Sequence, residues 1–294
     1  MARAFKRIIA VGDLHAEADF YRDILRACEL TDSDGRFAAS ETAFVVLGNV
    51  CDRGPDSASI YRSLIQLQAQ APKRGSRVYT LLGKHELMNL FGIHLDSSKS
   101  ERALYQEDSD PEATGFEHAF APGGWLARWL VTLPVVVRID PFIFAPADLP
   151  PVFRDLQLAD INRAVKQELD QHARSFRRGD ADLPLSLFSP ETSILCSDAA
   201  GQHAQPDYTT VLHTFLHNNR ANIYVCGHTP QTSGVFLKRY EGRYLCIDTA
   251  ASFVSQGFGA RAVFEWVNNE ARELLFTTTG LRTRKLSLPL SQTY

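Results

Sequence analysis

The sequence has few cysteines, no long apolar run and almost no net charge, and each of these features excludes a class of protein. Its five cysteines among 294 residues form no CxxC pair, which argues against a disulfide framework and a structural zinc site. No apolar run approaches the ~20 residues that a membrane-spanning helix needs, so we expect no membrane partner. The 31 basic and 34 acidic residues leave a net charge of −3 and give no overall attraction to nucleic acid.

The cysteines also bear on the compartment. Because unpaired cysteines persist where thiols stay reduced, we expect an intracellular compartment, either the cytoplasm or an organelle matrix such as the mitochondrial one. We expect one domain over residues 1–294, since strand patterns resume after each of two polar insertions, near 95–123 and 173–206.

The first half of the chain alternates strand and helix patterns. Apolar runs that are typical of buried strands lie at residues 7–11, 43–47 and 78–82. Helical spacing follows the first run, where Phe20, Ile24 and Ala27 share one face, and a short helix is expected after His85. Repeated strand–helix units predict a sheet with parallel strands, and ligands gather at the carboxyl ends of such strands.

The second half changes character. Helical spacing recurs at Ile161, Val165 and Leu169. Short strand patterns joined by turns lie at residues 222–226, 234–237, 243–248 and 261–267. This half therefore predicts a second sheet, antiparallel or mixed, that packs on the first.

Polar residues suited to bind ligands follow four of the expected strands. The loops read "GDLHA", with Asp13 and His15, "GNVCDRGPDS", "GKHE", and "GHTPQ" with His228. Each loop alone is a weak signal. Because the fold would deliver all four to one sheet edge, we expect them to form one site.

These loops resemble the motifs GDxHG, GDxxDRG, GNHE and GH of the calcineurin-like metallophosphatases, in the phosphoprotein phosphatase branch. The segments "PGGWLARWLVTLPVVVRID" (122–140), "INRAV" (161–165) and "IDTAAS" (247–252) further resemble the bacterial-type Shewanella-like phosphatases. The resemblance runs from about residue 7 to about residue 270. It implies an α/β fold with two packed mixed β-sheets flanked by helices, a four-layer αββα sandwich.

The resemblance also implies a metal centre. In that family two metal ions ~3.5–4 Å apart activate a water for attack on a phosphate ester. By resemblance, Asp13 and His15 would bind the first metal, position 49 would bridge both, and position 84 would bind the second together with His228. A further histidine of the family aligns with Pro146.

This chain departs from the family at three of these six ligand positions. Asn49 replaces a bridging carboxylate, Lys84 replaces an asparagine, and Pro146 replaces a histidine. A lysine ammonium ~4 Å from a divalent ion would be repelled by roughly 8 kcal/mol at an effective dielectric constant of 20. We expect the Lys84 ammonium near the second metal position, with Asp13 or Asn49 as its hydrogen-bond partner.

We therefore interpret the remaining set, Asp13, His15, Asn49 and His228, as a vestigial metal site and expect no cofactor. If any metal binds, we expect a single weakly held divalent ion, manganese, iron or zinc.

Three residues of the family's chemistry remain. By resemblance, His85 would be a proton-donating histidine, Asp52 its partner and Arg53 a phosphate-binding arginine, and Lys84 would add a second cation for phosphate. The family's other phosphate-binding arginine aligns with Ser197 in "TSILCSDA". Without an activated water, His85, Asp52 and Arg53 would be vestigial catalytic residues.

Three functions remain open. The first is a pseudophosphatase, catalytically impaired or inactive, that acts as a binding or scaffold component of a larger assembly. The second is an active phosphoesterase on serine/threonine or small substrates that uses one metal or a carbamylated Lys84. The third is a noncatalytic reader of phosphate or phosphopeptides that uses Arg53, His85 and Lys84 as a cationic pocket. We favour the first, a chain that is not an enzyme.

The expected partners follow from this choice. A protein partner or larger complex is expected, and a phosphorylated ligand is the alternative. A ribonucleoprotein contact is a further hypothesis, based on the basic cluster Arg174, Arg177 and Arg178.

Overall fold

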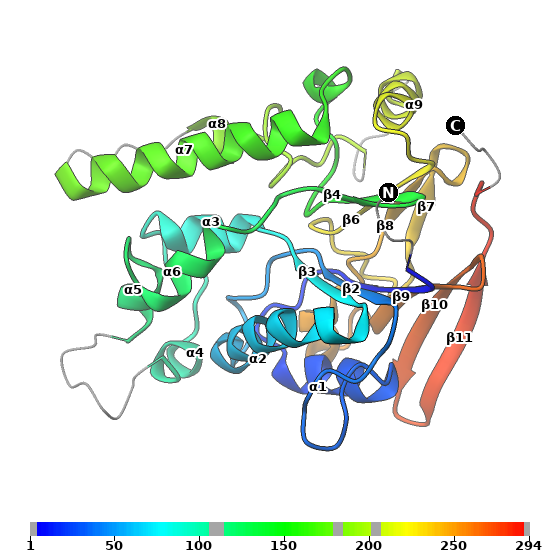
Figure 1. Ribbon diagram of the computed structural model, residues 1–294, viewed down its shortest axis with the longest axis horizontal. Coiled ribbons are helices and arrows are strands. Elements are labelled where there is room, and N and C mark those ends of the chain that lie inside the picture. The colour runs from blue at the N-terminus through cyan, green and yellow to red at the C-terminus, as the bar shows by residue number, and fades with distance from the viewer. Residues whose placement is uncertain (1–4, 106–114, 179–184, 201–206, 291–294) are drawn as a thin grey trace.

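The protein is built from two β-sheets that pack face to face, with helices on their outer sides (Figure 1). The computed structural model describes residues 5–105, 115–178, 185–200 and 207–290. This arrangement confirms the expected α/β class with two mixed sheets and flanking helices.

The first sheet has six strands in the order β11-β10-β9-β1-β2-β3. Their bounds are β1 Arg7–Val11, β2 Thr42–Val46, β3 Arg77–Thr80, β9 Arg261–Val267, β10 Glu270–Thr277 and β11 Gly280–Leu286. Strands β1, β2 and β3 are parallel, whereas β9 pairs antiparallel with β1. The prediction that residues 261–267 belong to the second sheet is therefore wrong, because this strand returns to the open edge of β1.

The second sheet has five strands in the order β4-β5-β6-β8-β7. Their bounds are β4 Val137–Ile139, β5 Phe142–Phe144, β6 Ile223–Cys226, β7 Leu237–Arg239 and β8 Tyr244–Cys246. Strands β5, β6 and β8 are parallel, and the two edge strands pair antiparallel. The carboxyl ends of β6 and β8 therefore meet at one edge.

Helices cover the outer faces of both sheets, with α1 and α2 on the first and α9 on the second (Figure 1). The α-helices are α1 Ala18–Ala27, α2 Ser57–Gln70, α3 Lys84–Leu90, α4 Lys99–Ala103, α5 Gly115–Phe120, α6 Trp125–Leu130, α7 Leu158–Arg178, α8 Leu185–Phe188 and α9 Tyr208–Asn218. Short 3-10 helices lie at Ala71–Arg74, Pro151–Phe153, Tyr240–Gly242 and Ala251–Gln256. None of the described helices combines the length and the apolar character that a bilayer-spanning segment needs.

The strands alternate between two hydrophobic cores. In β1, Ile8 and Ala10 belong to the core between the sheets, whereas Ile9 and Val11 belong to the core under the helices. Successive side chains of a strand point to opposite faces. Because both faces of the sheet are covered, the central strands read as continuous apolar runs.

Three local predictions differ from the structure. The strand expected at 234–237 is found at β7, Leu237–Arg239, so only its last predicted residue is in the strand. Phe20 and Ile24 of α1 are buried as expected, but Ala27 is exposed and Leu25 is buried in its place. The helix expected after His85 already begins at Lys84, where the Glu86 carboxylate accepts a hydrogen bond from the Gly83 N–H at 2.9 Å.

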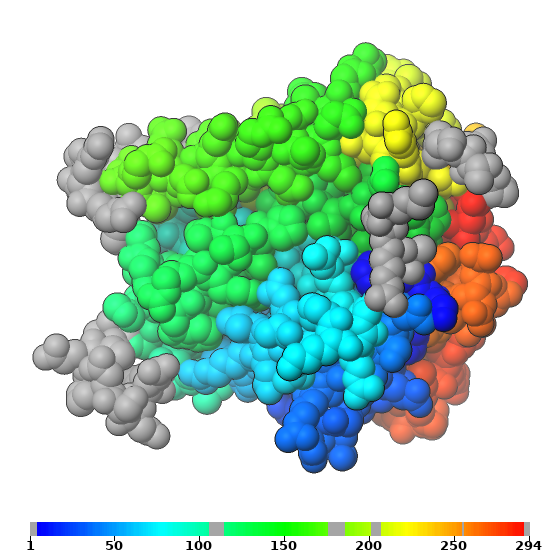
Figure 2. Space-filling view, in the orientation of Figure 1, coloured from blue at the N-terminus to red at the C-terminus, as the bar shows by residue number. Residues whose placement is uncertain are grey.

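The first polar insertion carries helices α4 and α5, and the second carries the end of α7 and the short helix α8. In the space-filling view α7 forms one side of the molecule, beside the segment of α5 and α6 (Figure 2). Parts of both insertions, 106–114, 179–184 and 201–206, lie outside the described residues. Arg174 is exposed, while the side chains of Arg177 and Arg178 are outside the description. That these segments belong to a single domain stays a prediction.

The core between the sheets gives a stability prediction. Phe264 is fully buried, with its ring centroid 5.3 Å from that of Phe142 and 6.4 Å from that of Phe144. Phe264→Ala should lower the free energy of unfolding by about 3–5 kcal/mol, because the two sheets cannot close over the cavity. Denaturant unfolding measures this loss.

Phe258→Ala is the matched control, because the Phe258 side chain is 58% exposed. Its effect should stay within about 0.5 kcal/mol. Equal losses for the two variants would contradict the assignment of Phe264 to the inter-sheet core.

Candidate functional site

The loop after β1 places two buried polar side chains at the sheet edge. Asp13 and His15 are 5% and 3% exposed, and His15 Nε2 lies 3.6 Å from Asp13 Oδ2. Asp13 Oδ1 accepts a hydrogen bond from the His228 backbone N–H at 3.0 Å. The approach is close, since a Cβ at Gly227 would lie 2.4 Å from Asp13 Oδ1. The first and fourth loops therefore meet, as the sequence predicts.

The side-chain amide of Asn49 bridges two of these loops. Its Nδ2 donates to Asp13 Oδ2 at 2.8 Å, and its Oδ1 accepts from the His85 backbone N–H at 3.0 Å. The backbone donor of His85 requires an oxygen at that position, so the amide nitrogen must face Asp13. Asn49 thereby provides a donor to Asp13 at the position where the family has a bridging carboxylate.

His15 is held as a neutral ring. Its Nδ1 donates to the Cys51 carbonyl at 3.1 Å, and its Nε2 accepts from Arg53 Nη1 at 3.2 Å. The guanidinium can only donate, so the Nε2 lone pair is engaged. Burial, with the nearby His85 and Arg53, lowers the pKa of His15 well below its usual value.

Asp52 and His85 form the pair that the resemblance implies. His85 Nδ1 lies 2.7 Å from Asp52 Oδ2, and both side chains are buried. Asn89 donates to both Asp52 oxygens at 3.1 Å and to the His85 carbonyl at 3.0 Å. The rings of His85 and His15 meet edge to face, with centroids 4.7 Å apart.

The position of Lys84 corrects a prediction. Lys84 forms no hydrogen bond with Asp13 or Asn49, whose polar atoms already have partners. Its charge acts instead on His228 and Cys196. Burial and then Lys84 lower the pKa of His228 to about 4. Arg53, rather than Lys84, is the cation that acts on Asp13.

The remaining predicted positions also lie at this edge. Pro146 follows β5, and its carbonyl accepts from the Gly227 N–H at 3.2 Å. Cys196 lies near Lys84 and His228, so the segment 192–199 borders the site. Ser197 is fully buried, and its hydroxyl has no partner among the described residues.

Sequence reasoning missed Asp248, which follows β8 and is 3% exposed. Burial raises the pKa of Asp248 to about 6. Burial and then Asp248 raise the pKa of Asp13 well above its usual value. The signal that could have found Asp248 is its place directly after a strand, the same rule that identified the other loops.

Two buried glutamates were also missed. Glu86 accepts from the backbone N–H groups of Asn49, Val50 and Gly83 and from the Tyr61 hydroxyl, at 2.7–2.9 Å. Glu101 of α4 accepts from the Asp52 N–H at 3.0 Å and from the Ser57 hydroxyl. Within the loop after β2, Glu86 thus holds Asn49 and Val50, and Glu101 holds Asp52.

These contacts test whether the residues fit the metal centre that the resemblance implies. Within the described ranges, no three His, Cys, Asp or Glu side chains are arranged to hold an ion. Asp13 and His15 use their metal-type donor atoms for protein hydrogen bonds, and Arg53 lies against His15. The donor set therefore does not fit a two-metal centre.

Glu101 gives a pH prediction. Its Oε2 is buried without a partner among the described residues, and burial raises its pKa from 4.5 to about 7. The folded state thus binds this proton more tightly, which stabilises it below pH 4.5, and the contribution is lost as pH rises through 7. Wild-type stability should fall by roughly 2 kcal/mol from pH 5 to 8 relative to Glu101→Gln.

Denaturant unfolding at both pH values measures this difference. Glu29→Gln, a change at an exposed glutamate, should track the wild type at each pH. If Glu101→Gln also tracks the wild type, Glu101 does not titrate in this range.

Comparisons with known proteins agree with the fold and with the resemblance of the loops. The family model described as calcineurin-like phosphoesterase matches residues 6–232. Shewanella-like protein phosphatase 1 of Plasmodium berghei (strain Anka) is 27% identical over 250 residues, 84% of this chain and 67% of that protein. An uncharacterized protein of Schizosaccharomyces pombe is 28% identical over 272 residues, 91% of this chain and 79% of that protein.

A solved structure shares the fold. The cold-active protein-tyrosine phosphatase of a psychrophilic Shewanella species superposes with a TM-score of 0.77 at 21% identity, over 98% of this chain and 83% of that chain.

Proposed function

The chain belongs to the calcineurin-like phosphoesterase family, and we propose that it is a pseudophosphatase that has lost metal-dependent hydrolysis. It then acts as a noncatalytic binding component of a larger assembly, with a protein partner. The contacts of Asp13 and His15 carry this proposal.

The donor atoms for a first metal are engaged within the protein. His228 N–H and Asn49 Nδ2 bond the two oxygens of Asp13, and Arg53 Nη1 bonds His15 Nε2. A divalent ion on His15 Nε2 would have the Arg53 charge within about 4 Å, a repulsion of roughly 8 kcal/mol at an effective dielectric constant of 20. Metal binding on His15 would require Arg53 to leave, because the single lone pair of His15 Nε2 accepts from Arg53.

The chain also offers few ligands at the second metal position. Pro146 offers only its carbonyl, which accepts from Gly227. The alternative, an enzyme with a carbamylated Lys84 or one metal, gains an anionic ligand from the carbamate but still has Pro146 in place of a histidine. A carbamate on Lys84 would compensate for the missing ligand at position 84, but nothing compensates for the missing histidine at position 146.

The charge of Lys84 favours a second candidate, a reader of phosphate or phosphopeptides. Within the described ranges Lys84 forms no hydrogen bond or ion pair, and Arg53 is exposed. Both cations act on His228, and two cations at one site suit the binding of an oxyanion without hydrolysis.

Metal content tests the pseudophosphatase. After incubation with manganese, iron or zinc at pH 7, the wild type should hold less than about 0.1 equivalent and show no p-nitrophenyl phosphate turnover, because its donor atoms are engaged. Asn49→Asp/Lys84→Asn/Pro146→His should bind at least about one equivalent, since it restores an anion, removes a cation and adds a ligand. Elemental mass spectrometry measures both.

Asn218→Asp/Lys73→Asn, which makes two of these exchanges away from the site, is the control and should bind no metal. Two equivalents on the wild type would overturn the proposal and make the carbamate the leading explanation.

Phosphate titration tests the reader. If the site binds oxyanions, inorganic phosphate should bind with an affinity that falls as salt rises, and Lys84→Ala should weaken it at least about tenfold. Lys73→Ala, at an exposed lysine, should leave the affinity unchanged. An unaffected Lys84→Ala variant would rule out this candidate.

A further inference from the structure

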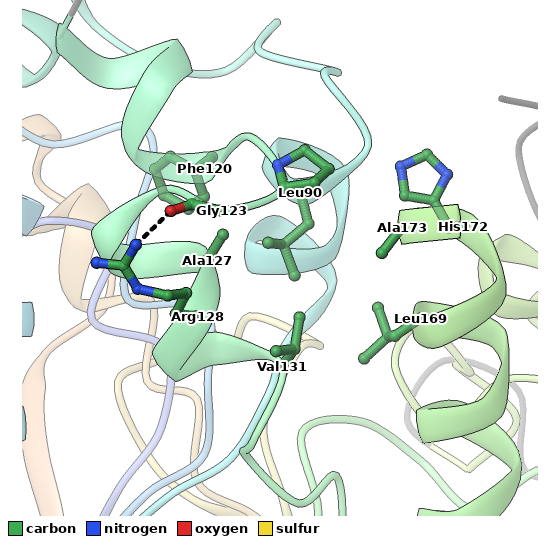
Figure 3. A pocket seen from close by; sticks show the side chains of 10 residues that line it. Leu90, Phe120, Gly123, Ala127, Arg128, Val131, Leu169, His172 and Ala173 are labelled. Carbon is green, nitrogen blue, oxygen red and sulfur yellow. Dashed lines mark hydrogen bonds between the residues drawn. The ribbon is translucent and has the colours of Figure 1, made fainter. Parts of the chain in front are cut away.

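A cavity of about 180 Å³ lies between the end of α3, the α5–α6 segment and α7. It shares no lining residue with the candidate site. Figure 3 shows Leu90, Ala127 and Val131 on one side of it, facing Leu169 and Ala173 on α7.

The walls of this cavity are mostly apolar. The lining includes six residues with apolar side chains: Leu90, Phe120, Ala127, Val131, Leu169 and Ala173. The cavity is also held open by its frame, since the rings of Phe91 and His172 pack with centroids 3.8 Å apart and fix α7 against the end of α3. Burial lowers the pKa of His172, so this wall is uncharged at neutral pH.

One lining residue carries a charge. Arg128 is exposed, and its Nη1 donates to the Gly123 carbonyl at 2.5 Å, which holds the guanidinium at the α6 side of the cavity (Figure 3). The other N–H groups of a guanidinium so placed remain able to donate to an anion. An apolar cavity with one cation at its edge is complementary to an apolar body that carries one negative charge.

We propose that this cavity binds a small carboxylate with an aromatic or branched-alkyl body, which lies between α6 and α7 while the carboxylate meets Arg128. The volume suits such a body, because a cavity of about 150 Å³ with aliphatic and aromatic walls is enough to bind benzene. A guanidinium is the side chain that best matches a carboxylate. This site is independent of the proposed pseudophosphatase function.

NMR titration of the whole protein with benzoate and with benzyl alcohol tests the proposal. Both should shift the backbone amides of α3, α6 and α7 saturably, with benzoate at least about fivefold tighter because only it meets Arg128. Arg128→Gln should bring the two affinities within about twofold of each other.

A second variant separates the cavity from the charge. Ala173→Leu, at a half-buried position on α7, should weaken both probes at least about tenfold by filling the space, and Ala127→Leu should do the same from the opposite wall. Arg163→Gln, an exposed arginine on α7 paired with Asp160, should change neither.

Three results would overturn the proposal. Equal affinities for benzoate and benzyl alcohol in the wild type would remove the role of Arg128. Binding that survives both Ala173→Leu and Ala127→Leu would place the probes elsewhere. Absence of saturable shifts with either probe would show that the cavity holds no such ligand.

Discussion

The side-chain amide of Asn49 is the contact on which the arrangement of the site depends. It donates to Asp13 and accepts from the N-terminal turn of α3, so one buried group joins the loops after β1, β2 and β3. Its backbone is fixed in turn by Glu86, which accepts from the Asn49 N–H at 2.9 Å. A carboxylate at position 49 would face Asp13 with like charge and would need a cation between them. The amide removes that need, because it brings its own donor.

The Asn49 amide also helps to explain how two buried carboxylates, Asp13 and Asp248, are compatible with folding. Asp13 and Asp248 are buried close together, and both have raised pKa values. Burial of two neighbouring carboxylates without compensation is costly. Here the compensation comes from the Asn49 and His228 donors, from the Arg53 charge and from a proton that the raised pKa values favour. The positive charge beside Asp13 and Asp248 therefore comes from Arg53 and from bound protons.

Much of the architecture can be predicted from the sequence, and the misses have physical reasons. The strands at 7–11, 43–47 and 78–82 are identifiable because both faces are buried, which leaves continuous apolar runs. Strand β11 has no such signal, since six of its seven residues are exposed and polar residues dominate it. The loops of the site follow from strand ends. The direction in which the Lys84 side chain points cannot be predicted in this way, because it depends on the hydrogen bonds that Asp13 and Asn49 form with other groups.

Glu101 shows where sequence reasoning reaches its limit and what the fold adds. It lies in a polar insertion and contacts Asp52, 49 residues earlier in the chain. No local pattern marks a glutamate in a polar stretch as buried, because its burial depends on α4 docking beside the N-terminus of α2. Once α4 is docked, Glu101 accepts from the Asp52 N–H while Glu86 accepts from the Val50 N–H. The loop that carries Asn49 and Asp52 is thus held by contacts with buried carboxylates of the protein itself.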